Sequence, residues 1–343
     1  MKVTVYSAKK YDIESFSKVQ DNYGIEYKFY DVPLSLDTVA LAQGSDAVCI
    51  FVNDKCDKPV VDALYDMGIR LIALRCAGFN NVDLDAAYKK IHVVRVPAYS
   101  PYAVAEHAMA LLLTSVRRIH KAYIRTRDYN FSLKGLTGFD LHGKTVGIIG
   151  TGKIGKIFAN ICKGFGMEII GYDKFPAPDF PGEYVELNEL LARSDIISLH
   201  CPLTDDTYHL MNKDTLKETK KGVIIVNTSR GALIDAEALV DSLKARQVGA
   251  VCLDVYEEES NLFFHDYSGH ILNDDVLARL ISMPNVIVTS HQAFLTNEAL
   301  ANIADTTSQN IVGFIKEGKF LNEVCYHCPK MNECKKKREG RCF

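Results

Sequence analysis

Short apolar runs alternate with helix-length segments along most of the chain. In the first hundred residues, five runs are rich in β-branched residues and long enough to form strands: 2–7, 25–30, 46–52, 70–74 and 92–96. Neighbouring parallel strands need a crossover connection, usually a helix, between them. The alternation therefore predicts a parallel sheet covered by helices.

This alternation is interrupted at residues 96–101, where two prolines occur. Ser100 followed by Pro101 is typical of a helix start. We predict a long helix from Pro101 to about Lys121 that connects the first domain to a second one. Its residues at helical spacing are Val104, Ala108, Leu111, Leu112 and Ser115.

The alternation resumes after residue 143 and continues to the C-terminal part. We expect strands near 195–199, 222–227, 248–253 and 286–289, and helices near 187–193 and 235–246. Asp235 is a suitable N-cap for the second of these helices. A last helix, from about Thr296 to Glu317, should return the chain to the first domain. That domain is then discontinuous, formed by residues 1–100 and the C-terminal part.

Composition narrows the class of protein. The 343 residues are enough for two domains with sizeable cores, and the net charge of -3 gives no indication of nucleic acid or an anionic membrane as a partner. The longest apolar candidate, Ala108 to Val116, is far shorter than a membrane span, and the N-terminus is predicted to be a strand and not an export segment. We expect a soluble cytoplasmic protein. Its scattered cysteines, mostly in or beside apolar runs, should be reduced core thiols: Cys49, Cys56, Cys76, Cys162, Cys201 and Cys252.

An apolar run from Lys144 breaks into a Gly-x-Gly-x-x-Gly pattern and continues as an amphipathic helix, Ile154 to Phe165. Gly150 permits a tight turn, Gly152 lets the backbone approach a pyrophosphate, and Gly155 lets helix and strand pack closely. A steric requirement of any tight strand-to-helix turn is the alternative explanation. However, a second strand, Met167 to Tyr172, ends at Asp173, where a carboxylate would bind the ribose hydroxyls. The combination predicts a dinucleotide site.

Three charged or titratable residues follow predicted strands of the second domain, where open α/β sheets place ligands. These residues are Arg230, Glu259 and His291. A guanidinium can bind a carboxylate with two hydrogen bonds, and a histidine held by a carboxylate can exchange a proton near neutral pH. Each has a structural alternative: Arg230 pairs with an acidic neighbour, Glu259 belongs to a solvated acidic run, and His291 caps a helix. Their shared position after strands of one sheet favours the functional interpretation.

The chain resembles the D-isomer-specific 2-hydroxyacid dehydrogenases, and most closely the bacterial fermentative D-lactate dehydrogenases, from Met1 to about Val324. The motifs that carry this resemblance are 75–83 (Arg-Cys-Ala-Gly-Phe-Asn-Asn-Val-Asp), 99–107 from Tyr99-Ser100-Pro101 to Ala105-Glu106-His107, the glycine loop, 227–231, 253–257 and 291–294. The resemblance implies an α/β fold with a Rossmann dinucleotide-binding domain, residues 101–295, inserted in a discontinuous flavodoxin-like catalytic domain, residues 1–100 and 296–343.

The resemblance also implies a role for each matching residue. Arg230 would bind the substrate carboxylate, His291 would protonate the carbonyl oxygen as hydride arrives from NADH, and Glu259 would hold the histidine tautomer and favour its protonated form. Backbone N–H groups of Ala77 and Gly78 would bind the same carboxylate. Phe51, Tyr99 and Phe294 would enclose a small substrate side chain. The positions that match cofactor contacts are Gly150, Thr151, Gly152, Lys153, Ile154, Gly155, Asp173, Cys201, Pro202, Thr228 and Asp254.

These assignments imply an NAD-dependent D-lactate dehydrogenase that reduces pyruvate and forms a homo-oligomer, a dimer or tetramer. Asp173 would repel a 2′-phosphate and so favours NAD over NADP, whereas the neighbouring Lys174 weakens that preference. A dehydrogenase for bulkier D-2-hydroxy acids is the alternative enzyme. An NAD-sensing binding protein similar to the carboxyl-terminal-binding-protein corepressors is the alternative outside enzymes, and turnover of pyruvate would distinguish it.

The C-terminal tail, 325–343, departs from the family pattern. It contains Cys325, Cys328, Cys334 and Cys342, together with His327 and a basic run. One C-x2-C pair at this spacing is compatible with zinc or an iron–sulfur cluster, but no second tight pair mirrors it. Free thiols or tail disulfides are the alternatives, and the predicted catalytic site contains no metal.

Overall fold

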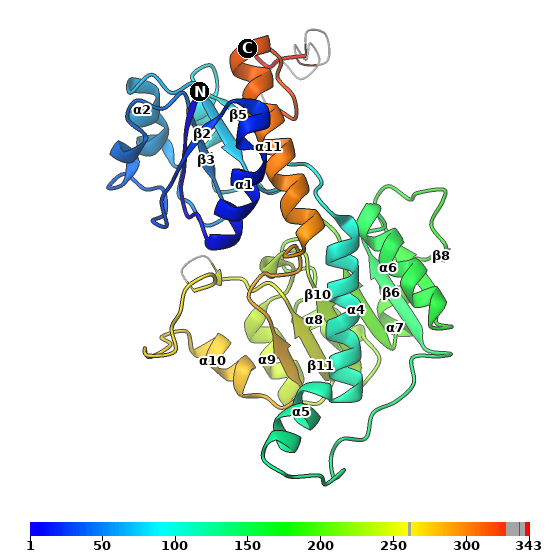
Figure 1. The fold of residues 1–343 in the computed structure, drawn as a ribbon. Helices are drawn as coiled ribbons and strands as arrows, with labels where there is room; N and C mark the ends of the chain where they lie inside the picture. The colour runs from blue at the N-terminus through cyan, green and yellow to red at the C-terminus, as the bar shows by residue number, and fades with distance from the viewer. Residues whose placement is uncertain (260–261, 327–335, 337–339) are drawn as a thin grey trace. The chain divides into compact units, whose positions relative to one another are not determined.

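A computed structural model describes residues 1–259, 262–326, 336 and 340–343 (Figure 1). The chain divides into two compact units. Unit 1 contains Met1–Ser100 and Leu295–Phe343, and unit 2 contains Pro101–Phe294. Among the described residues, no helix is both long and apolar enough to cross a membrane.

Unit 1 is built on a five-stranded parallel sheet in the order β2-β1-β3-β4-β5. This is the flavodoxin-like order, and the α/β fold predicted from the sequence is confirmed. All five predicted strands form, each slightly shorter than its apolar run: β1 (Lys2–Val5), β2 (Glu26–Phe29), β3 (Ala47–Ile50), β4 (Leu71–Leu74) and β5 (His92–Val94). Strands β3 and β4 are buried throughout, because helices cover both faces of the sheet.

The helices of unit 1 come from both ends of the chain. Figure 1 shows α1 (Lys10–Tyr23) beside α11 (Asn297–Glu317), the predicted C-terminal helix. Thr296 caps α11 by accepting a hydrogen bond from Ala299 N, and the helix ends at Gly318 in the left-handed conformation. The other helices of the described part of unit 1 are α2 (Lys58–Asp66), α3 (Leu84–Ala87) and the 3-10 helix η1 (Val39–Ala42).

Unit 2 contains a seven-stranded parallel sheet in the order β12-β11-β10-β9-β6-β7-β8. The strand order reverses between β6 and β9, which is the Rossmann arrangement with its ligand crevice at the switch point. The strands are β6 (Thr145–Ile149), β7 (Glu168–Tyr172), β8 (Glu183–Tyr184), β9 (Ile196–Leu199), β10 (Val223–Asn227), β11 (Val248–Leu253) and β12 (Val286–Val288). The pattern of apolar runs did not predict β8, which has only two residues.

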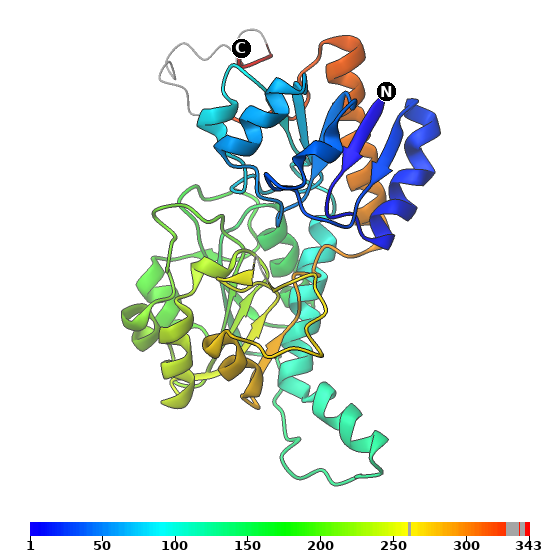
Figure 2. The ribbon, with the colours of Figure 1, turned by 90° about the vertical axis from the view of Figure 1, so that its left-hand side faces the viewer.

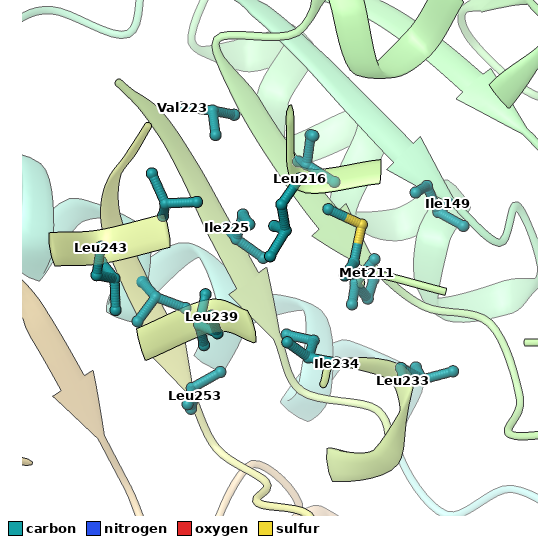
Figure 3. Close-up of a cluster of buried hydrophobic side chains, with 14 of the residues drawn as sticks. Ile149, Met211, Leu216, Val223, Ile225, Leu233, Ile234, Leu239, Leu243 and Leu253 are labelled. Atoms are coloured by element: carbon teal, nitrogen blue, oxygen red, sulfur yellow. The ribbon is translucent and has the colours of Figure 1, made fainter. Parts of the chain in front are cut away.

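Most helices of unit 2 pack on this sheet, and α5 is the exception among those described. Those described are α4 (Pro101–Arg117), α5 (Ile119–Arg127), α6 (Lys153–Gly164), α7 (Leu187–Arg193), α8 (Lys213–Glu218), the 3-10 helix η2 (Gly231–Leu233), α9 (Ala236–Lys244) and α10 (Asp275–Ser282). Asp235 caps α9 as predicted, by accepting a hydrogen bond from Ala238 N. Leu216 of α8 and Leu239 and Leu243 of α9 gather with Ile225 of β10 in one core cluster (Figure 3).

The predicted helix from Pro101 to Lys121 is wrong at its C-terminal end. Helix α4 stops at Arg117, Arg118 has a φ of 53°, and α5 follows in a new direction. The apolar stripe that α4 buries ends at Val116, whereas no residue of α5 is buried, so packing no longer supports the helix beyond that point. Figure 2 shows α5 and the segment after it extending away from the sheet of unit 2.

The six scattered cysteines are buried and free, as predicted. They lie in or next to the strands and helices of both cores. Burial raises the pKa of the Cys162 thiol to about 12, so it stays protonated at neutral pH. These thiols are therefore small apolar core groups.

Candidate active site

The glycine loop lies between β6 and α6, and each glycine meets a different steric requirement. Gly150 has a φ of 94°, which a side chain rarely adopts. A Cβ at Gly155 would lie 2.0 Å from Gly150 O, so this position brings helix and strand together. A Cβ at Gly152 would have no neighbour within 4 Å, which leaves open space beside the start of α6. Gly152 is also the N-cap of α6 and supplies no side-chain cap, so the first N–H groups are available for a phosphate.

Asp173, directly after β7, is hydrogen-bonded to this loop. Its Oδ2 accepts hydrogen bonds from Thr151 N at 2.7 Å and from Thr151 Oγ1 at 3.2 Å, and its Oδ1 accepts one from Phe175 N at 2.8 Å. Lys174 is directed elsewhere, because its Nζ lies 2.7 Å from Asp206 Oδ2. The loop and the carboxylate expected to bind ribose therefore lie together, as the Rossmann pattern requires.

The neighbouring strand ends carry the other predicted cofactor residues. Cys201 and Pro202 follow β9, and Cys201 N would be 2.5 Å from a Cβ at Gly150. Burial raises the pKa of the Cys201 thiol to about 11. Thr228 follows β10, and its Oγ1 is buried without a hydrogen-bond partner among the described residues. A buried hydroxyl without a partner is costly, and a bound dinucleotide with polar groups at these strand ends would satisfy it.

Arg230 lies two residues further along this loop. Its Nη1 donates a hydrogen bond to Ser229 O at 2.6 Å, and Asn227 Nδ2 donates one to Arg230 O at 2.8 Å. Within the described residues, no carboxylate lies within ion-pair distance of the Arg230 guanidinium. The described residues therefore do not contain the ion pair between Arg230 and an acidic neighbour that was the structural alternative. The half-buried guanidinium is free to bind an anion.

His291 and Glu259 form a close pair. The Nδ1 atom of His291 lies 2.7 Å from Oε1 of Glu259, and Glu259 Oε2 accepts a hydrogen bond from Tyr256 N at 2.9 Å. In the described structure Nε2 of His291 has no hydrogen-bond partner, so this nitrogen is the one available to a ligand. Glu259 is not simply part of a solvated acidic run, because it is bound to His291. His291 is not the cap of α11, because Thr296 is its N-cap.

The turn that carries His291 is held by Asp254, whose part in it was not apparent from the sequence. His291 has a φ of 51°, and its N donates a hydrogen bond to Asp254 O at 2.7 Å. The fully buried Asp254 carboxylate accepts hydrogen bonds from Thr289 Oγ1 at 2.6 Å, Gln292 N at 2.9 Å and Ala293 N at 2.8 Å.

His107 of α4 completes this network, since its Nε2 lies 3.3 Å from Asp254 Oδ1 and 3.2 Å from Thr289 Oγ1. Burial by itself would raise the pKa of Asp254. The hydrogen bonds from His107, Thr289 and the backbone outweigh burial and lower it below its usual value. Asp254 therefore anchors the turn that carries His291.

The remaining predicted residues are divided between the two units. In unit 1, Phe51 N donates a hydrogen bond to Asp54 Oδ2 at 2.6 Å, and the buried Arg75 guanidinium lies 4.8 Å from the centre of the Phe51 ring. Tyr99 is half-buried, and its carbonyl accepts a hydrogen bond from Asn302 Nδ2 at 2.7 Å. Ala77 and Gly78 form the loop after β4. Phe294 is buried in unit 2.

Comparison with known proteins identifies the family. A model described as "D-isomer specific 2-hydroxyacid dehydrogenase, NAD binding domain" matches residues 109–293. The chain is 52% identical over 328 residues to a D-lactate dehydrogenase of Escherichia coli K12, covering 94% of this chain and 100% of the relative. The chain belongs to the D-isomer-specific 2-hydroxyacid dehydrogenase family. The resemblance stated from the sequence motifs is confirmed.

Two solved structures share this fold at high similarity. The apo-structure of D-lactate dehydrogenase from Escherichia coli has a TM-score of 0.87 at 50% identity, covering 95% of this chain and 100% of that one. The structure titled for the pyruvate reductase of Chlamydomonas reinhardtii has a TM-score of 0.88 at 45% identity, covering 94% and 98%. Membership of this NAD-binding family, with the glycine loop and the free Thr228 hydroxyl, makes NAD the cofactor.

The C-terminal cysteines are not part of the dinucleotide or catalytic residues described above. Cys325 is exposed and Cys342 half-buried, and neither is in a disulfide, whereas His327, Cys328 and Cys334 lie outside the described residues. Burial, together with Glu323, raises the pKa of the Cys342 thiol to about 12. In the part of the chain that the structure describes, no group of three or more residues could hold a metal ion.

Proposed function

We propose that the protein is an NAD-dependent D-lactate dehydrogenase, which reduces pyruvate with NADH and oxidises D-lactate in the reverse direction. One observation carries the proposal. His291 is held through Nδ1 by Glu259 at 2.7 Å, and Arg230 lies on the same sheet edge. Among the residues that the structure describes, Nε2 of His291 has no hydrogen-bond partner and Arg230 has no acidic one. A proton donor and a carboxylate-binding cation are the two groups that reduction of a 2-oxo acid requires.

Each residue then has a defined task. Arg230 binds the substrate carboxylate and orients the ketone, and backbone N–H groups of Ala77 and Gly78 bind the same carboxylate. His291 gives the proton on Nε2 to the carbonyl oxygen and later recovers one from water. Glu259 fixes the other proton on Nδ1 and balances the charge of the imidazolium. NADH supplies the hydride to the carbonyl carbon. The products are D-lactate and NAD⁺.

The nucleotide is held by the loop and strand ends of unit 2. The N–H groups at the start of α6 bind the pyrophosphate, and Asp173 binds the adenosine ribose. Because Lys174 is paired with Asp206, the charge that a 2′-phosphate would meet is that of Asp173. This supports NAD over NADP. The similarity to D-lactate dehydrogenases and to a pyruvate reductase supports a methyl-sized substrate side chain enclosed by Phe51, Tyr99 and Phe294.

Two further predictions go with this function. The homo-oligomeric state is supported by α5 and the segment after it, where Ile124, Tyr129 and Leu133 are 59%, 85% and 80% exposed. Apolar residues exposed together in this way are typical of an interface. The cytoplasmic location stays a prediction.

A stereospecific assay of 2-oxo acids tests the function. We would measure the oxidation of NADH and NADPH with pyruvate, 2-oxobutyrate, 2-oxoisocaproate and phenylpyruvate, and determine the product enantiomer by chiral chromatography. Pyruvate with NADH should be preferred and should give D-lactate. A preference for phenylpyruvate would identify a dehydrogenase for bulkier acids. Tight NADH binding without turnover of any of these acids would identify an NAD-sensing binding protein.

A further inference from the structure

Three successive carbonyl groups of the loop after β4 accept hydrogen bonds. Cys76 O accepts a hydrogen bond from Val96 N at 3.1 Å, Ala77 O accepts one from Arg95 Nη1 at 2.7 Å, and Gly78 O accepts one from Cys76 Sγ at 3.3 Å. In a trans peptide the C=O and the following N–H point in opposite directions. The N–H groups of Ala77, Gly78 and Phe79 are therefore directed away from these donors.

Those three successive N–H groups have no acceptor within the described residues. Backbone donors are almost always paired with protein, water or a ligand. Successive backbone N–H groups that protein acceptors leave unbound can together bind an anion. Their arrangement depends on what holds the carbonyls behind them, and the central carbonyl, Ala77 O, is held by the Arg95 side chain.

Arg95 is itself fixed at its base. It directly follows β5, where its N donates a hydrogen bond to Asn322 O at 3.1 Å and its O accepts one from Asn310 Nδ2 at 2.9 Å. Its guanidinium also lies 5.1 Å from the centre of the Phe79 ring, on the loop that it holds. Both ends of the side chain are thus placed, and the guanidinium connects the end of β5 to the loop after β4.

The charge of Arg95 is not neutralised nearby. The guanidinium of Arg75, at the start of the same loop, is fully buried and paired with Asp12 at 3.1 Å. Arg95 is half-buried, and in the described part of the chain no carboxylate lies within ion-pair distance of it. A cation bound to Ala77 O polarises the Ala77–Gly78 peptide and makes its N–H a stronger donor toward an anion.

We propose that Arg95 is a positioning residue for the substrate carboxylate: it orients the Ala77–Gly78 peptide and places a positive charge behind it. This rests on the proposed function, in which that loop binds the carboxylate. Arg95 acts through the loop, whereas Arg230, on unit 2, binds the carboxylate directly. The carboxylate does not react, so Arg95 should contribute equally to substrate and transition-state binding. Its loss should raise KM for pyruvate and leave kcat unchanged.

Arg95→Met keeps the length of the side chain and removes its charge and donors. We expect KM for pyruvate to rise about tenfold, as for the loss of one hydrogen bond from a charged group, with kcat and KM for NADH within twofold of wild type. Arg95→Lys keeps the charge but loses the planar group that lies over Phe79, and it should give an intermediate KM. It also provides the test if Arg95→Met does not fold.

Arg70→Met is the matched control. Arg70 precedes β4, at the opposite end from the loop. It makes the same kinds of contact, because its Nη1 donates hydrogen bonds to Tyr65 O at 2.8 Å and Ile69 O at 2.9 Å and its guanidinium lies 4.0 Å from the centre of the Tyr65 ring. Its KM for pyruvate should be that of wild type, even where thermal stability falls.

Calorimetric titration of the enzyme–NADH complex with oxamate, a pyruvate analogue that is not reduced, separates the two proposals. Weaker oxamate binding in Arg95→Met, with normal binding in Arg70→Met, supports the role of Arg95 whichever 2-oxo acid the wild type reduces. Wild-type oxamate affinity in Arg95→Met overturns it, as does an equal loss in both variants or a fall in kcat that matches the rise in KM. Failure of the wild type to reduce pyruvate would overturn only the assignment as a lactate dehydrogenase.

Discussion

Glu259→Gln tests the proton donor, because it keeps the size of the side chain and removes its charge. Glu259 Oε1 lies 2.7 Å from His291 Nδ1, and the two side chains are 20% and 17% exposed. Two unit charges about 4 Å apart interact by about 4 kcal/mol at an effective dielectric constant of about 20. Since part of each side chain remains in water, we expect a net loss of about 1.5–3 kcal/mol, the range for hydrogen bonds to charged groups. This corresponds to a fall in kcat/KM for pyruvate of roughly 10- to 150-fold at pH 7.

Kinetics in both directions and a neighbouring control make this prediction specific. The ratio of the two kcat/KM values is fixed by the equilibrium constant of the reaction. The kcat/KM for D-lactate oxidation should therefore fall by the same factor as that for pyruvate reduction, with the affinity for NADH unchanged. Glu258→Gln is the control, because it removes the same charge from the adjacent exposed position. Steady-state kinetics in both directions measure these effects. Near wild-type reduction by Glu259→Gln, or an equal loss in Glu258→Gln, would refute the role of Glu259.

Other variants test the remaining parts of the site. Arg230→Lys keeps the charge but loses the two-pronged geometry, and kcat/KM for pyruvate should fall by about 2–4 kcal/mol in transition-state stabilisation; near wild-type efficiency would mean that another group binds the carboxylate. Wild-type enzyme should strongly prefer NADH because of Asp173, and equal efficiency with NADPH would contradict that assignment. Shrinking Phe51 or Tyr99 should shift preference gradually toward longer 2-oxo acids, by about 1–3 kcal/mol per methylene, and an unchanged ranking would remove both from the pocket. Asp254 has a lowered pKa, so its contribution to stability is present above its unfolded pKa, near 3.8, and is lost as pH falls through the lower folded value. Denaturant unfolding of Asp254→Asn should therefore show a loss of about 1–3 kcal/mol at pH 7 and little difference from wild type at the acid end; equal stability at pH 7 would contradict this.

The sheets could be predicted from the sequence because their strands are buried on both faces. A buried parallel strand is a continuous apolar run, and such runs stand out between amphipathic segments. For example, β10 and β11 formed where the runs near 222–227 and 248–253 predicted them. The end of α4 could not be predicted in the same way. Local propensity permits a helix through Arg118, and only the packing of the apolar stripe decides where it stops.

The candidate site could be predicted in part for a related reason. Glycines and charged residues at strand ends are visible in the sequence, and the parallel sheet brings these ends to one edge. The Glu259–His291 bond was expected from the family resemblance, and the structure contains it. Asp254 was assigned only as a cofactor contact, because nothing in Leu253-Asp254-Val255 shows that its carboxylate binds the turn at 289–293. The partners of a buried carboxylate depend on three-dimensional contacts between segments far apart in sequence.

Asp254 and Arg95 both support a backbone segment of the site, and their common arrangement explains why sequence motifs do not show this supporting role. In each case the residue expected to meet the substrate lies on a backbone segment with an unusual demand: His291 has a positive φ, and the Ala77–Gly78 peptide must direct its N–H outward. Such a segment keeps its shape only if other residues hydrogen-bond to the backbone groups that do not face the substrate. Asp254 does this for the three N–H groups at 291–293, because its backbone carbonyl accepts from the first and its carboxylate from the other two. The Arg95 guanidinium does it for the carbonyl of Ala77. The sign of the supporting charge follows from the backbone group that it binds. An anion accepts hydrogen bonds from the N–H groups of the turn that carries the proposed proton donor, and a cation donates one to a carbonyl of the loop whose N–H groups are proposed to bind the substrate carboxylate.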